Sequence, residues 1–238
     1  MKYRSRAIGF CLLVTLVSAI YVSAQDAETL RRAAIYEPLI IEAGARRGVD
    51  PHLLWTIAYL ETRFRPDQVS AAGARGMMQF MPLTAKRFGL DDPHHPEAAI
   101  DAAARYLRKL QGMFNHRLDL VLAAYNSGEE TVMAYRDGRR LLLSNGKVIN
   151  PKGIKTGGVP PYRETYSYVN NGMELFLRLA RRREDGNGTT FAHLKTPERI
   201  NEEGPMEPLP REITQLKQGS IYIIDSTLRA SSSSIYPQ

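Results

Sequence analysis

Proline and glycine residues divide residues 28–183 of this 238-residue chain into helical segments, and this division constrains the fold more than any other feature. Apolar residues recur at helical spacing, as at Ile100 and Leu107, while Asp50 and Pro51 form a favourable helix start. The pattern predicts helices over residues 38–47, 51–63, 82–89, 96–114, 118–126, 129–135 and 162–182. We therefore expect an all-α domain.

Two stretches depart from the helical pattern. The Asn145-Gly146 pair favours a tight turn and predicts a small β-hairpin around it. Residues 185–238 are rich in Gly, Asn, Thr, Glu, Pro and Ser, which predicts an irregular or disordered C-terminal tail with one strand-like run at 220–225. The globular domain is accordingly expected over residues 25–184.

The first 24 residues have the composition of an export signal. Three basic residues precede an apolar run over residues 7–22, and Val22 and Ala24 suit the −3 and −1 positions of a cleavage site. Cleavage after Ala24 would give a periplasmic or otherwise exported protein. A retained membrane anchor is the alternative, although the run is shorter than the roughly 20 apolar residues that span a bilayer.

Charge and cysteine content limit the classes of function. The chain has 32 basic and 25 acidic residues, so loss of Lys2, Arg4 and Arg6 with the signal leaves 29 against 25, a net charge of +4. This mild bias favours transient association with an anionic cell envelope but, without a dense basic stripe, does not predict nucleic-acid binding. The only cysteine, Cys11, would leave with the signal. We expect a soluble monomer without disulfides.

Glu61 occupies an unusual place for a carboxylate. It follows Leu54, Ile57 and Ala58 at helical spacing, which puts it on the apolar stripe of the helix predicted over residues 51–63. Burial disfavours the charged form, so the pKa of Glu61 is expected to be raised, and the residue could deliver a proton as a general acid. The alternative is a Glu at the edge of the stripe with its carboxylate in water.

A glycine-rich loop follows this helix. Gly73 and Gly76 allow a tight bend and a close approach of the backbone to a ligand. Gln79 offers an amide beside the apolar Met78 and Met81. This combination suits a sugar that carries an N-acetyl group, although either glycine alone would indicate only a structural turn.

Two later segments place aromatic and polar side chains at helix ends. Tyr125 and Asn126 end one predicted helix, and Glu164 and Tyr168 lie near the start of the last. Each of the first three has a structural alternative: core packing for Tyr125, helix termination for Asn126 and a favourable helix-dipole interaction for Glu164.

In this order, the segments closely resemble the soluble lytic murein transglycosylases, whose catalytic domain has a lysozyme-like helical fold. The resemblance covers about residues 36–180, and its motifs are Glu61-Thr62-Arg63-Phe64-Arg65-Pro66, Ser70 with Gly73-Ala74-Arg75-Gly76-Met77-Met78-Gln79-Phe80-Met81-Pro82, Ala124-Tyr125-Asn126-Ser127-Gly128 and Glu164-Thr165-Tyr166-Ser167-Tyr168-Val169. Thr62, Met77 and Phe80 depart from the commoner residues of the family but keep hydroxyl or apolar character.

The resemblance implies that Glu61 is the single catalytic acid and base and that peptidoglycan strands are the substrate. It also implies two groups of substrate-binding residues, one in the glycan groove and one beside Glu61 that holds the reacting sugar. These are Ser70, Gln79, Met81, Tyr125 and Asn126 in the groove, and Tyr168 and Glu164 beside Glu61.

The number of carboxylates bears on the reaction. Ordinary glycosidases use two, whereas these motifs supply one evident acid. The resemblance implies that Glu61 protonates the glycosidic oxygen and then takes a proton from the C6 hydroxyl of the same N-acetylmuramic acid, which leaves a 1,6-anhydro end. Two alternatives are a muramidase that hydrolyses the same bond and a non-catalytic glycan-binding module.

The sequence predicts no metal and no cofactor. His94 and His95 lie in a Pro-flanked acidic turn and are expected to be solvated. No His pair has the helical spacing of metal ligands, and no Gly-x-Ser-x-Gly elbow is present. Trp55, on the Glu61 helix, is expected to be a core residue.

Overall fold

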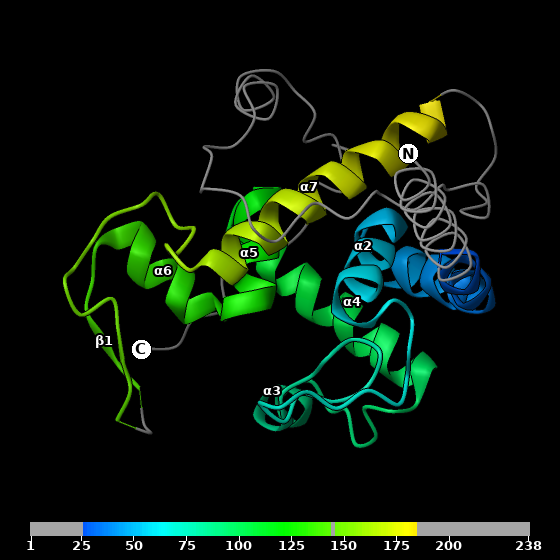
Figure 1. Ribbon diagram of the computed structural model, residues 1–238, viewed down its shortest axis with the longest axis horizontal. Helices are drawn as coiled ribbons and strands as arrows, with labels where there is room; N and C mark the ends of the chain where they lie inside the picture. The colour runs from blue at the N-terminus through cyan, green and yellow to red at the C-terminus, as the bar shows by residue number, and fades with distance from the viewer. Residues whose placement is uncertain (1–25, 144–145, 185–238) are drawn as a thin grey trace, which may run out of the picture.

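Helices make up most of the computed structural model, which describes residues 26–143 and 146–184 (Figure 1). One helix covers residues 26–47, and the remaining elements are α2 (Pro51–Thr62), α3 (Pro82–Arg87), α4 (Pro96–Met113), α5 (Leu118–Ser127), α6 (Glu129–Asp137), β1 (Leu141–Leu142), β2 (Val148–Ile149) and α7 (Arg163–Glu184). The expected helical architecture with a small hairpin is confirmed. The predicted export signal, the tail and the turn residue Asn145 lie outside the described residues.

Helix 26–47 begins earlier than its sequence predicts. Pro38 looked like a helix start, but it lies inside the helix, where its nitrogen has no hydrogen to donate to the preceding turn. The upstream residues remain helical because Thr29 and Ala33, one turn apart, are each only 1% exposed and bury one helix face. Burial of this face outweighs the missing hydrogen bond.

The helix that carries Glu61 begins and ends as predicted. The Asp50 carboxylate accepts a hydrogen bond from the backbone N–H of His52 at 2.8 Å, and Pro51 lies in the first turn. At the other end, Arg63 adopts a left-handed conformation with φ of 53°, and its N–H caps the helix by donating to Ala58 and Tyr59. α2 therefore ends just after Glu61.

Packing of α7 against α2 and α5 forms the centre of the fold. Figure 1 shows α7 crossing α5 on its way toward α2. Gly172 permits the close approach, since a Cβ there would lie 2.9 Å from Cδ1 of Leu122 and 3.1 Å from Cδ1 of Leu60. Trp55 is 1% exposed, as predicted, within a core whose largest fully buried side chains also include Phe64, Ile40, Leu53, Leu54, Ile57, Met77, Met78, Ile100, Leu107, Leu110 and Leu122.

The segment between α2 and α3 contains the glycine-rich loop that the sequence predicts. Isolated bridges join Arg75 to Val69 and to Phe80. The Thr62 hydroxyl, at the end of α2, donates to the carbonyl of Met77 at 2.9 Å. The loop is therefore attached directly to the residue that follows Glu61.

The two glycines of this loop serve different purposes. Gly73 has a φ of 86°, and a Cβ added to it would meet no atom within 4 Å. Gly76 has a φ of 76°, and a Cβ there would lie 1.7 Å from the carbonyl oxygen of Pro93. Gly76 is thus required by a close approach of the loop to the protein's own backbone at Pro93.

The hairpin between α6 and α7 is antiparallel, with Leu141 opposite Ile149 and Leu142 opposite Val148. In residues 26–143 and 146–184, no helix combines the length and apolar character needed to cross a membrane.

Candidate active site

Glu61 lies in the last turn of α2 on the predicted apolar stripe, and the stripe residues Leu54, Ile57 and Ala58 have no exposed surface. The Glu61 side chain is itself partly buried. Its Oε1 accepts a hydrogen bond from the hydroxyl of Tyr168, on α7, at 2.7 Å. The carboxylate is therefore held at the junction of two helices.

Burial raises the pKa of Glu61 to about 7, although the hydrogen bond from Tyr168 lowers it and the negative charge of Glu164 adds to the increase. The alternative of a fully solvated carboxylate is wrong, and the predicted increase in pKa is confirmed. A carboxyl group with this pKa exchanges its proton near neutral pH, as a residue that acts first as an acid and then as a base must do.

Two tyrosines line the carboxylate and remain protonated. Burial, followed by the charge of Glu61, raises the pKa of both Tyr125 and Tyr168 well above 10. The Tyr125 hydroxyl donates to the carbonyl oxygen of Met78 at 2.9 Å, which connects α5 to the glycine-rich loop. Both hydroxyls therefore act as fixed hydrogen-bond donors.

Asn126 is attached to α7 by one side-chain hydrogen bond. The Thr165 hydroxyl donates to Oδ1 of Asn126 at 2.8 Å, and Thr165 is 2% exposed. Gly128, with a φ of 88°, ends α5 and begins α6. Asn126 therefore lies at a helix end, as its structural alternative states, and is held there by the same helix that carries Tyr168.

The polar side chains of the glycine-rich loop bond within the loop. The Ser70 hydroxyl accepts from the backbone N–H of Ala74 at 3.0 Å. The Gln79 side chain donates from Nε2 to the carbonyl oxygen of Gly76 at 2.9 Å, while its own backbone has a φ of 49°. Met81 is 44% exposed at the start of α3. Within residues 26–143 and 146–184, these bonds leave Oε1 of Gln79 and the hydroxyl hydrogen of Ser70 without a partner in the protein.

Residues 38–141 match the family described as the transglycosylase SLT domain. This part of the chain therefore carries an SLT domain. Its SLT domain is 42% identical over 101 residues to the peptidoglycan transglycosylase gp16 of Escherichia phage T7, a match that covers 40% of this chain and 8% of gp16. It is 34% identical over 118 residues to the membrane-bound lytic murein transglycosylase F of Marinobacter nauticus, covering 47% of this chain and 23% of that protein.

Among solved structures, the 70 kDa soluble lytic transglycosylase of Escherichia coli shares 23% sequence identity with this chain, with a TM-score of 0.49. That match covers 65% of this chain and 25% of the E. coli protein. The SLT-domain chain thus spans a quarter or less of the length of these three proteins.

The candidate site includes one residue to which the sequence assigns no role. Thr165 stands beside Glu164 in a motif already singled out, but only the packing of α7 on α5 shows that its hydroxyl reaches Asn126. Its position one turn before Tyr168 was the available signal, since residues at this spacing share a helix face.

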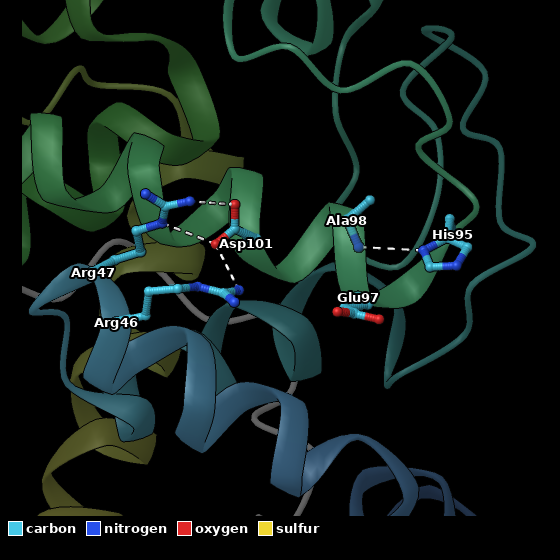
Figure 2. Close-up of a pocket in the computed structure, with 6 residues that line it drawn as sticks. All are labelled: Arg46, Arg47, His95, Glu97, Ala98 and Asp101. Carbon is cyan, nitrogen blue, oxygen red and sulfur yellow. Dashed lines mark hydrogen bonds and ion pairs between the residues drawn. The ribbon is translucent and has the colours of Figure 1, made fainter.

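A second polar cluster of the SLT domain lies between helix 26–47 and α4 and shares no residue with the Glu61 site. Figure 2 shows Arg46 and Arg47 pointing toward Asp101, and Arg46 Nη2 and Arg47 Nε each lie 2.9 Å from its Oδ1. The hydrogen bond from Arg47 lowers the pKa of Asp101. A shallow pocket is lined by Arg46, Arg47, His95, Glu97, Ala98 and Asp101. We infer that these ion pairs stabilise the packing of helix 26–47 on α4.

The two adjacent histidines differ from each other. His94 is partly buried and its Nδ1 lies 3.0 Å from the carbonyl oxygen of Pro66, so the prediction of a solvated ring is wrong for His94. The exposed His95 accepts at Nδ1 from the backbone N–H of Ala98 at 3.4 Å and caps α4. Within the described part of the SLT domain, no cluster of His, Cys, Asp or Glu could hold a metal ion.

Proposed function

We propose that this SLT-domain protein is a peptidoglycan lytic transglycosylase that cleaves the β-1,4 bond between N-acetylmuramic acid and N-acetylglucosamine and leaves a 1,6-anhydro end. The observation that carries the proposal is Glu61, whose pKa is raised to about 7 while Tyr168 donates to its carboxylate. The names of the relatives support the reaction class, since they include a peptidoglycan transglycosylase and a lytic murein transglycosylase.

The reaction needs one carboxyl group in two protonation states. Protonated Glu61 gives its proton to the glycosidic oxygen as the bond from C1 of the muramic acid breaks. The resulting carboxylate accepts the proton of the C6 hydroxyl while that oxygen bonds to C1. No water is consumed, and Glu61 ends protonated. Tyr168 stabilises the carboxylate between the two steps because a hydrogen bond to a charged group is stronger than one to a neutral group.

The charge of Glu164 also affects Glu61, but the Glu164 side chain is exposed in the first turn of α7. Because burial is what makes Glu61 a proton donor and Glu164 lacks it, we assign Glu164 to the sugar-binding surface and not to proton transfer. Substrate binding is further assigned to Ser70, Gln79, Met81, Tyr125, Asn126 and Tyr168.

Mass spectrometry of digested sacculi tests the proposal. The wild-type protein should release products that end in anhydro-muramic acid, one water lighter than the products of hydrolysis. Products with a reducing muramic acid would instead identify a muramidase. The Glu61→Gln variant is the matched control, and equal solubilisation of sacculi by variant and wild type would exclude catalysis by Glu61.

We also propose that the protein is exported and cleaved after Ala24, and that residues 25–184 form the catalytic domain. The basic and apolar pattern of the first 24 residues supports this. N-terminal sequencing of the protein recovered from a periplasmic fraction should begin at Gln25, whereas an intact N-terminus in the membrane fraction would indicate an anchor.

A further inference from the structure

We propose that Thr165 is a positioning residue that fixes the side-chain amide of Asn126 with its NH2 group directed at the glycan. The inference rests on the proposed function only for the nature of the ligand. Thr165 lies in the first turn of α7 and Asn126 in the last turn of α5, and the Thr165 hydroxyl donates to Oδ1 of Asn126 at 2.8 Å.

An asparagine amide has an acceptor end and a donor end, and the hydrogen bond of one end decides where the other points. The Thr165 hydroxyl occupies Oδ1 from the protein interior, because Thr165 is 2% exposed. Asn126 itself is partly exposed, and across residues 26–143 and 146–184 its Nδ2 has no hydrogen-bond acceptor in the protein. The donor end is therefore accessible to a ligand.

The chemistry of the ligand follows from this orientation. An NH2 group recognises acceptors, so Asn126 would bind a carbonyl oxygen such as that of an acetamido group on the sugar. A flipped amide would present Oδ1 instead and would meet that carbonyl with an acceptor. In the orientation that the structure has, Thr165 would thus hold the NH2 group of Asn126 toward the sugar without itself touching the sugar.

Thr165 is also one turn before Tyr168, so a change at Thr165 could act on Glu61 by displacing α7. Orientation of the Asn126 amide and displacement of α7 have different effects on the kinetics. Loss of the amide orientation weakens substrate binding and leaves the pKa of Glu61 unchanged. Displacement of α7 lengthens the contact between Tyr168 and Glu61 and moves the alkaline limb of the pH–rate profile.

Thr165→Val and Thr165→Ser form a matched pair, since valine keeps the shape of threonine without the hydroxyl and serine keeps the hydroxyl. Cleavage of a defined tetrasaccharide of alternating N-acetylglucosamine and N-acetylmuramic acid is followed by loss of substrate, which registers hydrolysis as well as transglycosylation. We expect Thr165→Val to raise KM about tenfold, the effect of one lost hydrogen bond, with kcat and the pH profile unchanged. Thr165→Ser should stay within about threefold of wild type.

A double-mutant cycle tests whether Thr165 acts through Asn126. In an Asn126→Ala background, Thr165→Val should have no further effect on KM. Additive effects would overturn the inference, as would a Thr165→Val variant with wild-type KM, a Thr165→Ser variant as impaired as Thr165→Val, or a shifted alkaline limb. Thermal melts establish that each variant folds, and Thr165→Ala replaces Thr165→Val if the valine variant does not.

Failure of the proposed function is separable from failure of this inference. If the wild-type protein cleaves nothing, the same substitutions are compared for direct binding of the tetrasaccharide to the Glu61→Gln variant by calorimetry. A weaker Kd with Thr165→Val and recovery with Thr165→Ser would then support the positioning role alone, and equal Kd values for all three would overturn it.

Discussion

The Tyr168 hydroxyl donates to Oε1 of Glu61 at 2.7 Å across a sequence separation of 107 residues, and this bond joins α7 to α2 at the candidate site. It stabilises the charged form of Glu61, whereas burial and the charge of Glu164 stabilise the neutral form. The opposing effects leave the pKa of Glu61 at about 7. Both protonation states are thus accessible at neutral pH.

Wild-type kcat/KM should fall as the pH rises through about 7, because Glu61 must be protonated to act as an acid. Tyr168→Phe removes the bond that favours the carboxylate, so the alkaline limb should move to higher pH by about one unit. Rates measured on the tetrasaccharide across the pH range test this.

Glu164→Gln should shift the pH–rate profile in the direction opposite to Tyr168→Phe. It removes a negative charge that raises the pKa of Glu61, so the alkaline limb should move to lower pH. The shift should be smaller than that of Tyr168→Phe, since Glu164 is exposed and its field is screened by salt. Shifts of both variants in the same direction would contradict this account of the electrostatics.

Glu61 should also make stability depend on pH. Its pKa is raised from 4.5 to about 7 in the folded protein. The contribution of Glu61 to the free energy of unfolding is therefore fully present below pH 4.5 and is lost as the pH rises through about 7. Glu61→Gln removes this loss and should stabilise the protein at pH 8 by on the order of 2 kcal/mol, with little effect at pH 4. Chemical unfolding at the two pH values measures the difference, and a destabilised variant at pH 8 would refute it.

The contribution of Glu129 to stability should depend on pH in the opposite sense to that of Glu61. Burial alone would raise its pKa, but hydrogen bonds from Tyr106, its own backbone, Lys109 and Arg87 outweigh burial and lower it from 4.5 to about 2. Its stabilising effect is therefore present above pH 4.5 and is lost as the pH falls toward about 2. Glu129→Gln should cost on the order of 2 kcal/mol at pH 7 and little at pH 2. Unfolding curves at both pH values test this.

The neighbouring Glu130 is the matched control for Glu129, since it is exposed in the same helical turn. Glu130→Gln should change stability by less than about 0.5 kcal/mol at either pH. A loss comparable to that of Glu129→Gln would mean that general charge, and not the buried network, determines the effect.

The glycine-rich loop offers a comparison of two glycines with similar backbones. Gly73→Ala adds only the strain of a left-handed alanine, about 1 kcal/mol, because a Cβ there meets no atom. Gly76→Ala carries the same strain and also drives a Cβ to 1.7 Å from the Pro93 oxygen, so it should cost about 1–3 kcal/mol more. Denaturant midpoints distinguish the two variants, and equal midpoints would show that the loop yields freely at Pro93.

Most of the helices could be predicted from the sequence because their signals are local. Asp50 and Pro51 start α2, and Asn145-Gly146 indicates the hairpin. The error at Pro38 shows the limit of local signals: a proline that usually starts a helix lies inside one because burial of Thr29 and Ala33 is a tertiary effect.

The sequence by itself determined that Glu61 lies on the apolar stripe of its helix, because helical spacing is a local property of the chain. Only the tertiary structure decided which groups surround that carboxylate. Tyr168 reaches Glu61, and Thr165 reaches Asn126, through the packing of α7 on α2 and α5. Helical periodicity fixes which face a residue occupies, but the partner of that face depends on how the helices pack, and residues 107 positions apart carry no local signal of their contact.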